Sequence, residues 1–222
     1  FRKIKGLKFL SFSWASIKVF LLESRFIFIS NFSTRVYGFI SIPMGGFLMS
    51  PTQLGIFAAA SKLINVGQNV LFQPLHGALL PYLASRVKES KDNYLKEHRR
   101  FLVLLASAIA IISLGLIFLA PWFIPLIFGQ QYIEAIPLLQ LMAPMLFIGV
   151  FAHLYLQQGL LILAKDRQYM NLILIIGTLS IILNYFLIGS YQEMGAALAR
   201  LITEFLLALF AALAFYKSLR KN

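Results

Sequence analysis

The chain has 222 residues, of which 59% are hydrophobic and only 13% are charged. Soluble domains carry charge on about a quarter of their residues, so this composition argues against a soluble protein. The net charge is +12, but the basic residues lie beside apolar stretches, as in membrane proteins, so no nucleic-acid partner is expected. The sequence contains no Cys, which excludes thiolate, redox and Cys-ligated zinc chemistry. Its three His residues form no metal-ligand motif, and neither a metal nor a cofactor is expected.

The first 24 residues are predicted to form a basic linker and an amphipathic helix that lies on the membrane surface. Four basic residues occur within residues 1–8. Apolar residues then recur at helical spacing, at Leu10, Trp14, Ile17 and Leu21. The chain opens on Phe1 rather than Met, and we expect it to be a fragment of a longer protein.

Residues 25–222 are predicted to form a lobe of six transmembrane helices. Six apolar stretches each have about 20 residues or more, enough to cross roughly 30 Å of hydrocarbon. They cover residues 25–49, 55–83, 101–128, 135–164, 169–188 and 194–216. The fourth stretch is interrupted by Pro137 and Pro144. The sequence therefore predicts an all-α, polytopic membrane protein.

The basic residues alternate between the two sides of this predicted lobe. Sixteen of the twenty lie before the first stretch, within residues 84–100 and 165–167, or after the sixth stretch. The connections at 50–53, 129–134 and 189–193 contain none. By the positive-inside rule, both termini are predicted to be cytoplasmic, in a multi-pass protein of a bacterial-type inner membrane. The opposite connections are too short to form a domain, so we expect function within the helices, with no catalytic residue and no enzyme activity.

One face of the second stretch is polar along its length. Lys62, Asn65, Asn69, Gln73 and His76 follow the spacing i, i+3, i+7, i+11 and i+14, which places them along one side of a helix. Asn and Gln also join helices to one another within membranes, but five polar groups that include a cation favour the wall of a cavity. His76 is in addition a candidate proton-linked group, although a lone His is more often packed and neutral.

Other polar residues lie inside the first and fourth stretches. Asn31 and Arg35 share one face of the first, and Arg35 lies about 15 Å into the helix, near the middle of the bilayer. Its side chain cannot easily reach either membrane surface, so a hydrated cavity is expected around it. His153 and Gln157, four residues apart in the fourth stretch, are predicted to hydrogen-bond to each other.

The buried charges are unbalanced. Arg200 and Glu204, four residues apart in the sixth stretch, are predicted to form an ion pair. Arg35 and Lys62 then have no acidic partner inside the helices, and buried cations are costly unless an anion or water accompanies them. We therefore expect a ligand that carries phosphate or another negative group. The predicted substrate-binding residues are Arg35, Lys62, Asn65, Asn69, Gln73, Asn31 and Arg200.

Short motifs in a set order run through almost the whole chain. They are LGIFAAASK at 54–62, QP at 73–74, LP at 80–81, AP at 120–121, LIFGQQY at 126–132, QQGLL at 157–161, KD at 165–166, NYFLI at 184–188 and MGAALA at 194–199. In this order they resemble the second half of a polysaccharide flippase of the O-antigen (Wzx-type) group, within the multidrug/oligosaccharidyl-lipid/polysaccharide exporter superfamily.

The resemblance implies two six-helix lobes around a central cavity, of which this chain is the C-terminal lobe. It implies a polyprenyl-pyrophosphate-linked oligosaccharide as substrate, moved from the cytoplasmic to the outer leaflet by alternating access. The implied partners are membrane lipid, the missing N-terminal lobe and proteins of polysaccharide assembly.

Parts of the sequence are also compatible with other functions. A lipid II flippase of the same superfamily remains an alternative. A multidrug or cation antiporter would need a buried acid, for which Glu204 is the candidate, and its predicted pairing with Arg200 argues against that role. A membrane-embedded polysaccharide polymerase or ligase would need an outer loop or a catalytic acid and base, and the short outer connections offer only Glu134 and Glu193. A structural scaffold would not need the polar face of the second stretch.

Overall fold

The computed structural model describes residues 29, 33 and 37–220, and every element within them is helical. The elements are α2 (Ser41–Leu48), α3 (Pro51–Glu89), α4 (Lys91–Phe128), the 3-10 turn η1 (Gln130–Tyr132), α5 (Ala135–Met142), α6 (Pro144–Tyr155), the π-helical turn η2 (Leu156–Leu161) and α7 (Asp166–Arg220). The predicted all-α fold is confirmed. The predicted amphipathic helix lies outside the described residues.

The two longest antiparallel helices are joined by a single residue. Ser90 ends α3 and caps α4, where its Oγ accepts a hydrogen bond from the backbone N–H of Asn93 at 3.0 Å. At its other end α3 begins with a capping box between Ser50 and Gln53. The connection predicted over residues 84–100 is therefore helical on both sides of Ser90, because α3 and α4 continue beyond the apolar stretches.

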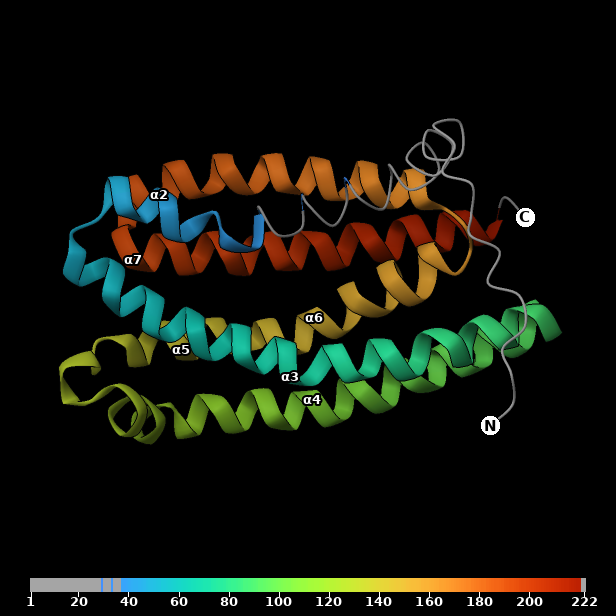
Figure 1. Cartoon of the computed structure of the whole chain (residues 1–222), viewed down its shortest axis with the longest axis horizontal. Coiled ribbons are helices and arrows are strands. Elements are labelled where there is room, and N and C mark those ends of the chain that lie inside the picture. Colours follow the sequence, from blue (N-terminus) through green and yellow to red (C-terminus); the bar gives the residue numbers. More distant parts are fainter. Residues whose placement is uncertain (1–28, 30–32, 34–36, 221–222) are drawn as a thin grey trace, which may run out of the picture.

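Helix α7 contains both the fifth and the sixth predicted stretches. Its backbone leaves helical geometry at Gln192, with φ 52° and ψ −128°, and its two halves lie antiparallel (Figure 1). A Cβ on Gly195 would overlap the backbone of Leu187, so the chain passes very close to itself at this turn. The predicted connection over residues 189–193 is thus reduced to one non-helical residue.

The connections sort to the two ends of an elongated bundle, as the charge pattern predicts. The junctions near Ser90 and Lys165 lie at the same end as the C-terminal part of α7. The turn before α3, the η1 segment and the turn at Gln192 lie at the opposite end (Figure 1). Within the described part of the chain, the basic connections therefore share one end of the molecule, and the connections without basic residues share the other.

Three helical segments within the described residues are long and apolar enough to cross a membrane: Lys91–Phe128, Ala135–Leu161 and Asp166–Arg220. Large apolar side chains of α4, such as Phe118 and Leu126, are exposed along its outer face, as expected of a surface that meets lipid. Helix α3 is long enough as well, at 39 residues, but its polar face lowers its hydropathy. The six predicted spans are thus supported in part.

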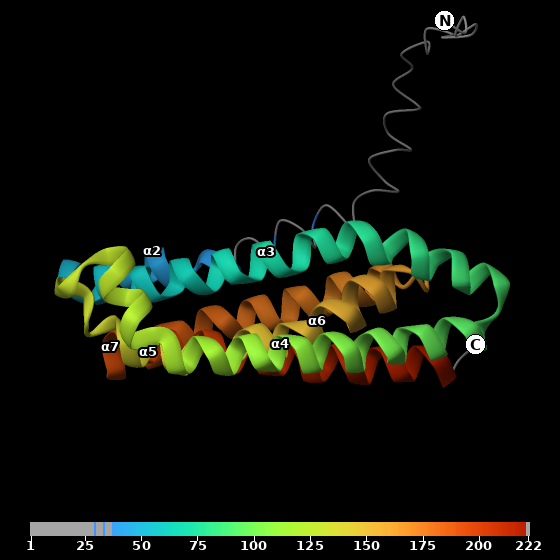
Figure 2. The ribbon, with the colours of Figure 1, turned by 90° about the horizontal axis from the view of Figure 1, so that it is seen from below.

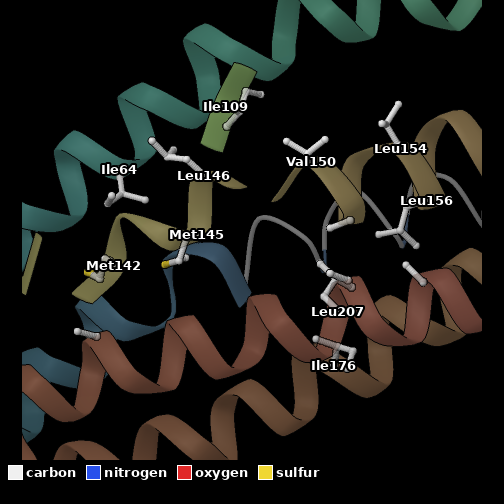
Figure 3. Close-up of a cluster of buried hydrophobic side chains, with 14 of the residues drawn as sticks. Ile64, Ile109, Met142, Met145, Leu146, Val150, Leu154, Leu156, Ile176 and Leu207 are labelled. Atoms are coloured by element: carbon white, nitrogen blue, oxygen red, sulfur yellow. The ribbon is translucent and has the colours of Figure 1, made fainter. Parts of the chain in front are cut away.

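The fourth predicted stretch forms the centre of the bundle. Over half of the most apolar window of Ala135–Leu161 is buried, 56%, against 11% in α4. Figure 3 shows its buried residues packed against α3, α4 and α7. They are Met142, Met145, Leu146, Val150, Leu154 and Leu156, which meet Ile64, Ile109, Ile176 and Leu207. This central segment is also the one that departs most from regular helix.

Two features interrupt this central segment. Pro144 begins α6, and the carbonyl of Ala143, just before it, accepts a hydrogen bond at 2.8 Å from the Ser113 hydroxyl of α4. Further on, α6 passes into the π-helical turn η2. Figure 2 shows α4 running beside α6 over most of this length. Neighbouring helices thus satisfy the backbone where the central segment breaks, as membrane interiors require.

Candidate functional site

A polar cleft lies where α3, α6, η2 and the two halves of α7 meet. It has two parts, with volumes of about 610 Å³ and 410 Å³. Both parts are lined by Tyr37, Gln68, Asn69, Gln73, Gln157 and Glu204. Because they share these residues, we treat them as one cleft and name its ends the Arg200 part and the His76 part.

The Arg200 part holds a buried cation. The Arg200 side chain lies in α7 with only 8% of the residue exposed, and its Nη2 donates a hydrogen bond to Oδ1 of Asn65 in α3 at 2.7 Å. Ser180 and Thr203 complete the polar wall. A guanidinium has five N–H donors, so one amide acceptor among the described residues leaves other donors able to bind acceptors from the cleft.

The predicted ion pair between Arg200 and Glu204 is not formed at ordinary contact distance. Within the described part of the chain, the ion pairs shorter than 4.0 Å join Arg86 to Glu89 and Arg100 to Glu97, outside the cleft. Helical spacing places Arg200 and Glu204 near each other, but the guanidinium bonds to Asn65, which α3 brings within reach. The Glu204 side chain instead lines both parts of the cleft.

The His76 part is lined by aromatic rings and amides. The rings of Phe72 and His153 stack at 5.3 Å, and His76 meets His153 edge-on at 5.8 Å. Among the described residues, the Nε2 atom of His153 has no hydrogen-bond partner. The predicted bond from His153 to Gln157 is thus replaced by ring contacts, while Gln157 lines the cleft.

Most of the predicted polar face of the second stretch does line this cleft. Asn65, Asn69 and Gln73 lie along the Arg200 part, and His76 lies at the other end. Gln73 also donates a hydrogen bond to Asn69 at 3.5 Å, so the amides partly satisfy each other. Lys62 is exposed and lines neither part. Asn31 and Arg35 lie outside the described residues.

Sequence reasoning did not predict three of the residues that line both parts of the cleft. Gln68 follows Asn65 by three positions, so helical spacing could have identified it. Tyr37 precedes α2 and lines both parts, and no pattern in the first stretch singles it out. Gln157 was predicted to bond to His153, as regular helical spacing suggests. Its observed position in the cleft depends instead on the π-helical turn. The observed cleft is therefore richer in amides than the predicted one.

Among the described residues, the cleft combines one buried guanidinium, four amide side chains of α3, one of η2, and a carboxylate. An amide can donate and accept hydrogen bonds at once, as sugar hydroxyls require. A guanidinium binds phosphate or carboxylate oxygens in pairs. The arrangement is suited to a polar ligand that also carries negative charge.

The sequence of the chain is similar to those of known polysaccharide biosynthesis and transport proteins. The profile of the family described as "Polysaccharide biosynthesis protein" matches residues 8–137. A protein of Escherichia coli (strain K12) is 26% identical over 184 residues, covering 83% of this chain and 44% of its own length. One of Shigella dysenteriae is 28% identical over 210 residues, covering 94% of this chain and 52% of its own length. Both bear the name "Putative O-antigen transporter".

The chain spans about half the length of the curated relatives it matches. No solved structure gives a significant match to it. The family profile covers more than half of the chain. The matched region includes α2, α3 and α4, and α3 carries Asn65 and the other amides of the cleft. With its membrane-spanning helices and polar cleft, the chain belongs to the polysaccharide biosynthesis protein family.

Proposed function

We propose that this chain is the C-terminal lobe of an exporter that moves a polyprenyl-pyrophosphate-linked oligosaccharide from the cytoplasmic to the outer leaflet of the cell membrane. The polar cleft would face a second lobe of similar size, and the two lobes would expose it to each side in turn. The names of the curated relatives support transport of O-antigen, and their greater length is consistent with a second lobe.

The buried guanidinium of Arg200 carries the proposal. It lies in the interior of a membrane protein, is bonded to a neutral amide, and has no acidic partner within 4.0 Å among the described residues. Such a cation is costly to bury unless an anion accompanies it. A pyrophosphate would supply that anion during each passage of the substrate.

The lining residues divide into two groups by chemistry. Arg200 would hold phosphate oxygens, with Arg35 as a second cation from the first stretch. The amides of Asn69, Gln73 and Gln68 would bind sugar hydroxyls along the rest of the cleft. Lys62 was proposed for the phosphate as well, but its exposed position outside both parts of the cleft gives this role no support.

The proposal is tested in cells whose surface polysaccharide depends on the full-length protein. Arg200→Gln removes the charge and keeps a polar side chain of similar reach, and Arg200→Lys keeps the charge without the paired donors. We expect both to reduce export, with lipid-linked oligosaccharide accumulating in the membrane. Arg86→Gln, at an ion pair outside the cleft, is the matched control and should export normally.

A normal export rate for Arg200→Gln at an equal amount of membrane protein would contradict the proposal. Arg35→Lys and Arg35→Ala extend the test to the first stretch, where bidentate binding of phosphate predicts loss of export in both. If the Arg35 variants export normally while the Arg200 variants do not, the phosphate is held by α7 alone.

A second candidate, ion-coupled antiport, is favoured by the position of Glu204. The acid was expected to be neutralised by Arg200, but the observed bond from Arg200 to Asn65 leaves its carboxylate lining the cleft. An acid inside a membrane can bind a proton or a cation. Glu204→Gln distinguishes the roles: loss of export with normal retention of substrate would indicate a coupling group.

The proposed orientation follows from the charge pattern. The end of the bundle with the junctions near Ser90 and Lys165 would face the cytoplasm. Asn65 and Arg200 then lie nearer the outer surface, and His76 lies nearer the cytoplasm. The substrate would meet the His76 part of the cleft first and the Arg200 part later in its passage.

A further inference from the structure

The π-helical turn η2 and the end of α6 just before it are held in place by two side chains from the start of α4. Tyr94 Oη donates to the carbonyl oxygen of Gln158 at 2.8 Å. His98 Nε2 lies 3.2 Å from the carbonyl oxygen of Leu154, and since a carbonyl can only accept, Nε2 carries the hydrogen. Tyr94 is fully buried and His98 is 3% exposed.

These two residues stand in one of the most charged segments of the chain, KDNYLKEHRR at 91–100. Their spacing of four places both on the same face of α4, and that face turns inward while most of the charged residues around it are exposed. Sequence alone marks the segment as a solvated basic connection. The structure shows that its inner face reaches the central segment of the bundle.

An aromatic cluster supports the same contact. The His98 ring stacks on Phe215 of α7 at 4.8 Å, and Tyr155 lies 5.5 Å from Phe215. Gly159 of η2 permits this packing, because a Cβ there would lie 2.8 Å from the Phe215 ring. The turn is thus fixed by hydrogen bonds from α4 and by close packing from α7.

The geometry of η2 decides which of its side chains reach the cleft. Gln157 lines both parts of the cleft. The next residue, Gln158, is fully buried, and its Nε2 lies 3.5 Å from Nδ1 of His76. Return of the π turn to regular α-helix would remove one residue from the turn and rotate these side chains by about 100°.

We propose that Tyr94 and His98 are positioning residues of the cleft. By bonding to the carbonyls of Gln158 and Leu154, they keep η2 in its π-helical form and so direct Gln157 into the cleft. They also keep Gln158 against His76. Their effect on export rests on the proposed function, whereas their effect on the position of Gln157 does not.

The position of Gln157 can be measured by labelling. The chain contains no Cys, so Gln157→Cys provides a single reporter in a full-length protein freed of other cysteines. A small hydrophilic maleimide is applied to permeabilised membranes, and the labelling rate is followed. Tyr94→Phe removes one hydroxyl, and we expect the rate at position 157 to fall about fivefold, as loss of one net hydrogen bond allows.

Matched variants distinguish an effect on the position of Gln157 from a general destabilisation of the bundle. Gln73→Cys reports from α3 in the same cleft and should keep its rate in the Tyr94→Phe protein. Tyr216→Phe removes a hydroxyl from the same aromatic cluster, where it bonds to Tyr155 at 3.4 Å and not to η2, and should leave both reporters unchanged. His98→Leu should act like Tyr94→Phe, while His98→Gln, which keeps a donor, should restore the rate.

An unchanged rate at position 157 in both Tyr94→Phe and His98→Leu would overturn the proposal. An equal fall at positions 157 and 73 would also overturn it, because the two residues would then only stabilise the bundle. If labelling responds as expected while the Arg200 variants export normally, the positioning role stands and the proposed function fails.

Discussion

The bond between Asn65 and Arg200 is predicted to be one of the stronger single contacts between helices in this protein. Side-chain hydrogen bonds between membrane helices average about 0.6 kcal/mol and reach about 1.7 kcal/mol. Hydrogen bonds to charged groups contribute about 1.5–3 kcal/mol in proteins generally. Arg200 is 8% exposed as a residue, and the bond is 2.7 Å long. We therefore expect Asn65→Ala to lower the free energy of unfolding by about 1.5 kcal/mol, where these two ranges overlap.

Equilibrium unfolding of the full-length protein in mixed micelles provides the assay. Asn69→Ala is the matched control, because Asn69 lies one helical turn away on the same face and its bond to Gln73 is a long 3.5 Å. We expect it to cost about 0.5 kcal/mol or less, below the average for such bonds. A double-mutant cycle of Asn65→Ala with Arg200→Met should give a coupling energy of about 1 kcal/mol. Equal costs for the two Asn variants, or additivity within about 0.5 kcal/mol, would refute the reasoning.

Three further predictions concern packing, backbone strain and topology. Gly159→Ala should destabilise the protein by about 1–3 kcal/mol through overpacking. Gly77→Ala is the control: a Cβ there meets nothing within 4 Å, so it should be neutral or stabilise the protein by up to about 1 kcal/mol. Similar unfolding midpoints for the two variants would contradict the packing of η2. Gln192→Gly should stabilise the protein by about 1 kcal/mol because it relieves the positive φ at the turn of α7, and a lower midpoint would count against that turn. A Cys at Gln53 should react with an impermeant reagent from outside the cell and a Cys at Lys165 only after permeabilisation, and the reverse pattern would invert the orientation.

The placement of the helices could be predicted because hydropathy and basic charge are local properties of the sequence. The alternation of basic connections predicts which ends of the helices lie together, and the bundle has that arrangement (Figure 1). The positions of the breaks were harder to predict. The pattern predicts connections over residues 84–100 and 189–193, but Ser90 is one polar residue within a long basic segment and Gln192 is neither Gly nor Pro, so nothing marks either as the single residue at which the chain reverses.

The candidate site was predictable where it depends on one helix and unpredictable where it depends on two. The spacing of Asn65, Asn69 and Gln73 is a property of α3 alone, and all three line the cleft. The partner of Arg200 depends on how α3 packs against α7, so helical spacing pointed to Glu204 while the structure gives Asn65. The exposed position of Lys62 likewise follows from packing and not from its place on the polar face.

The π-helical turn has no signature in a sequence pattern that assumes 3.6 residues per turn. For this reason Gln157 was paired with His153, four residues earlier, although the turn directs it into the cleft. The inner face of the segment at 91–100 was hidden for a related reason: Tyr94 and His98 are two buried residues among eight others that are mostly charged or polar.

Transfer of substrate between leaflets tests the central claim most directly, namely that the buried cation of the cleft serves an anionic lipid-linked oligosaccharide. The full-length protein is reconstituted into liposomes that carry the lipid-linked oligosaccharide, and a lectin added outside measures the fraction that reaches the outer leaflet over time. Our account predicts transfer by the wild-type protein and by Arg86→Gln, and transfer at least about tenfold slower with Arg200→Gln, as the loss of about 1.4 kcal/mol of binding to a charged group implies. Equal rates for all three proteins would contradict it.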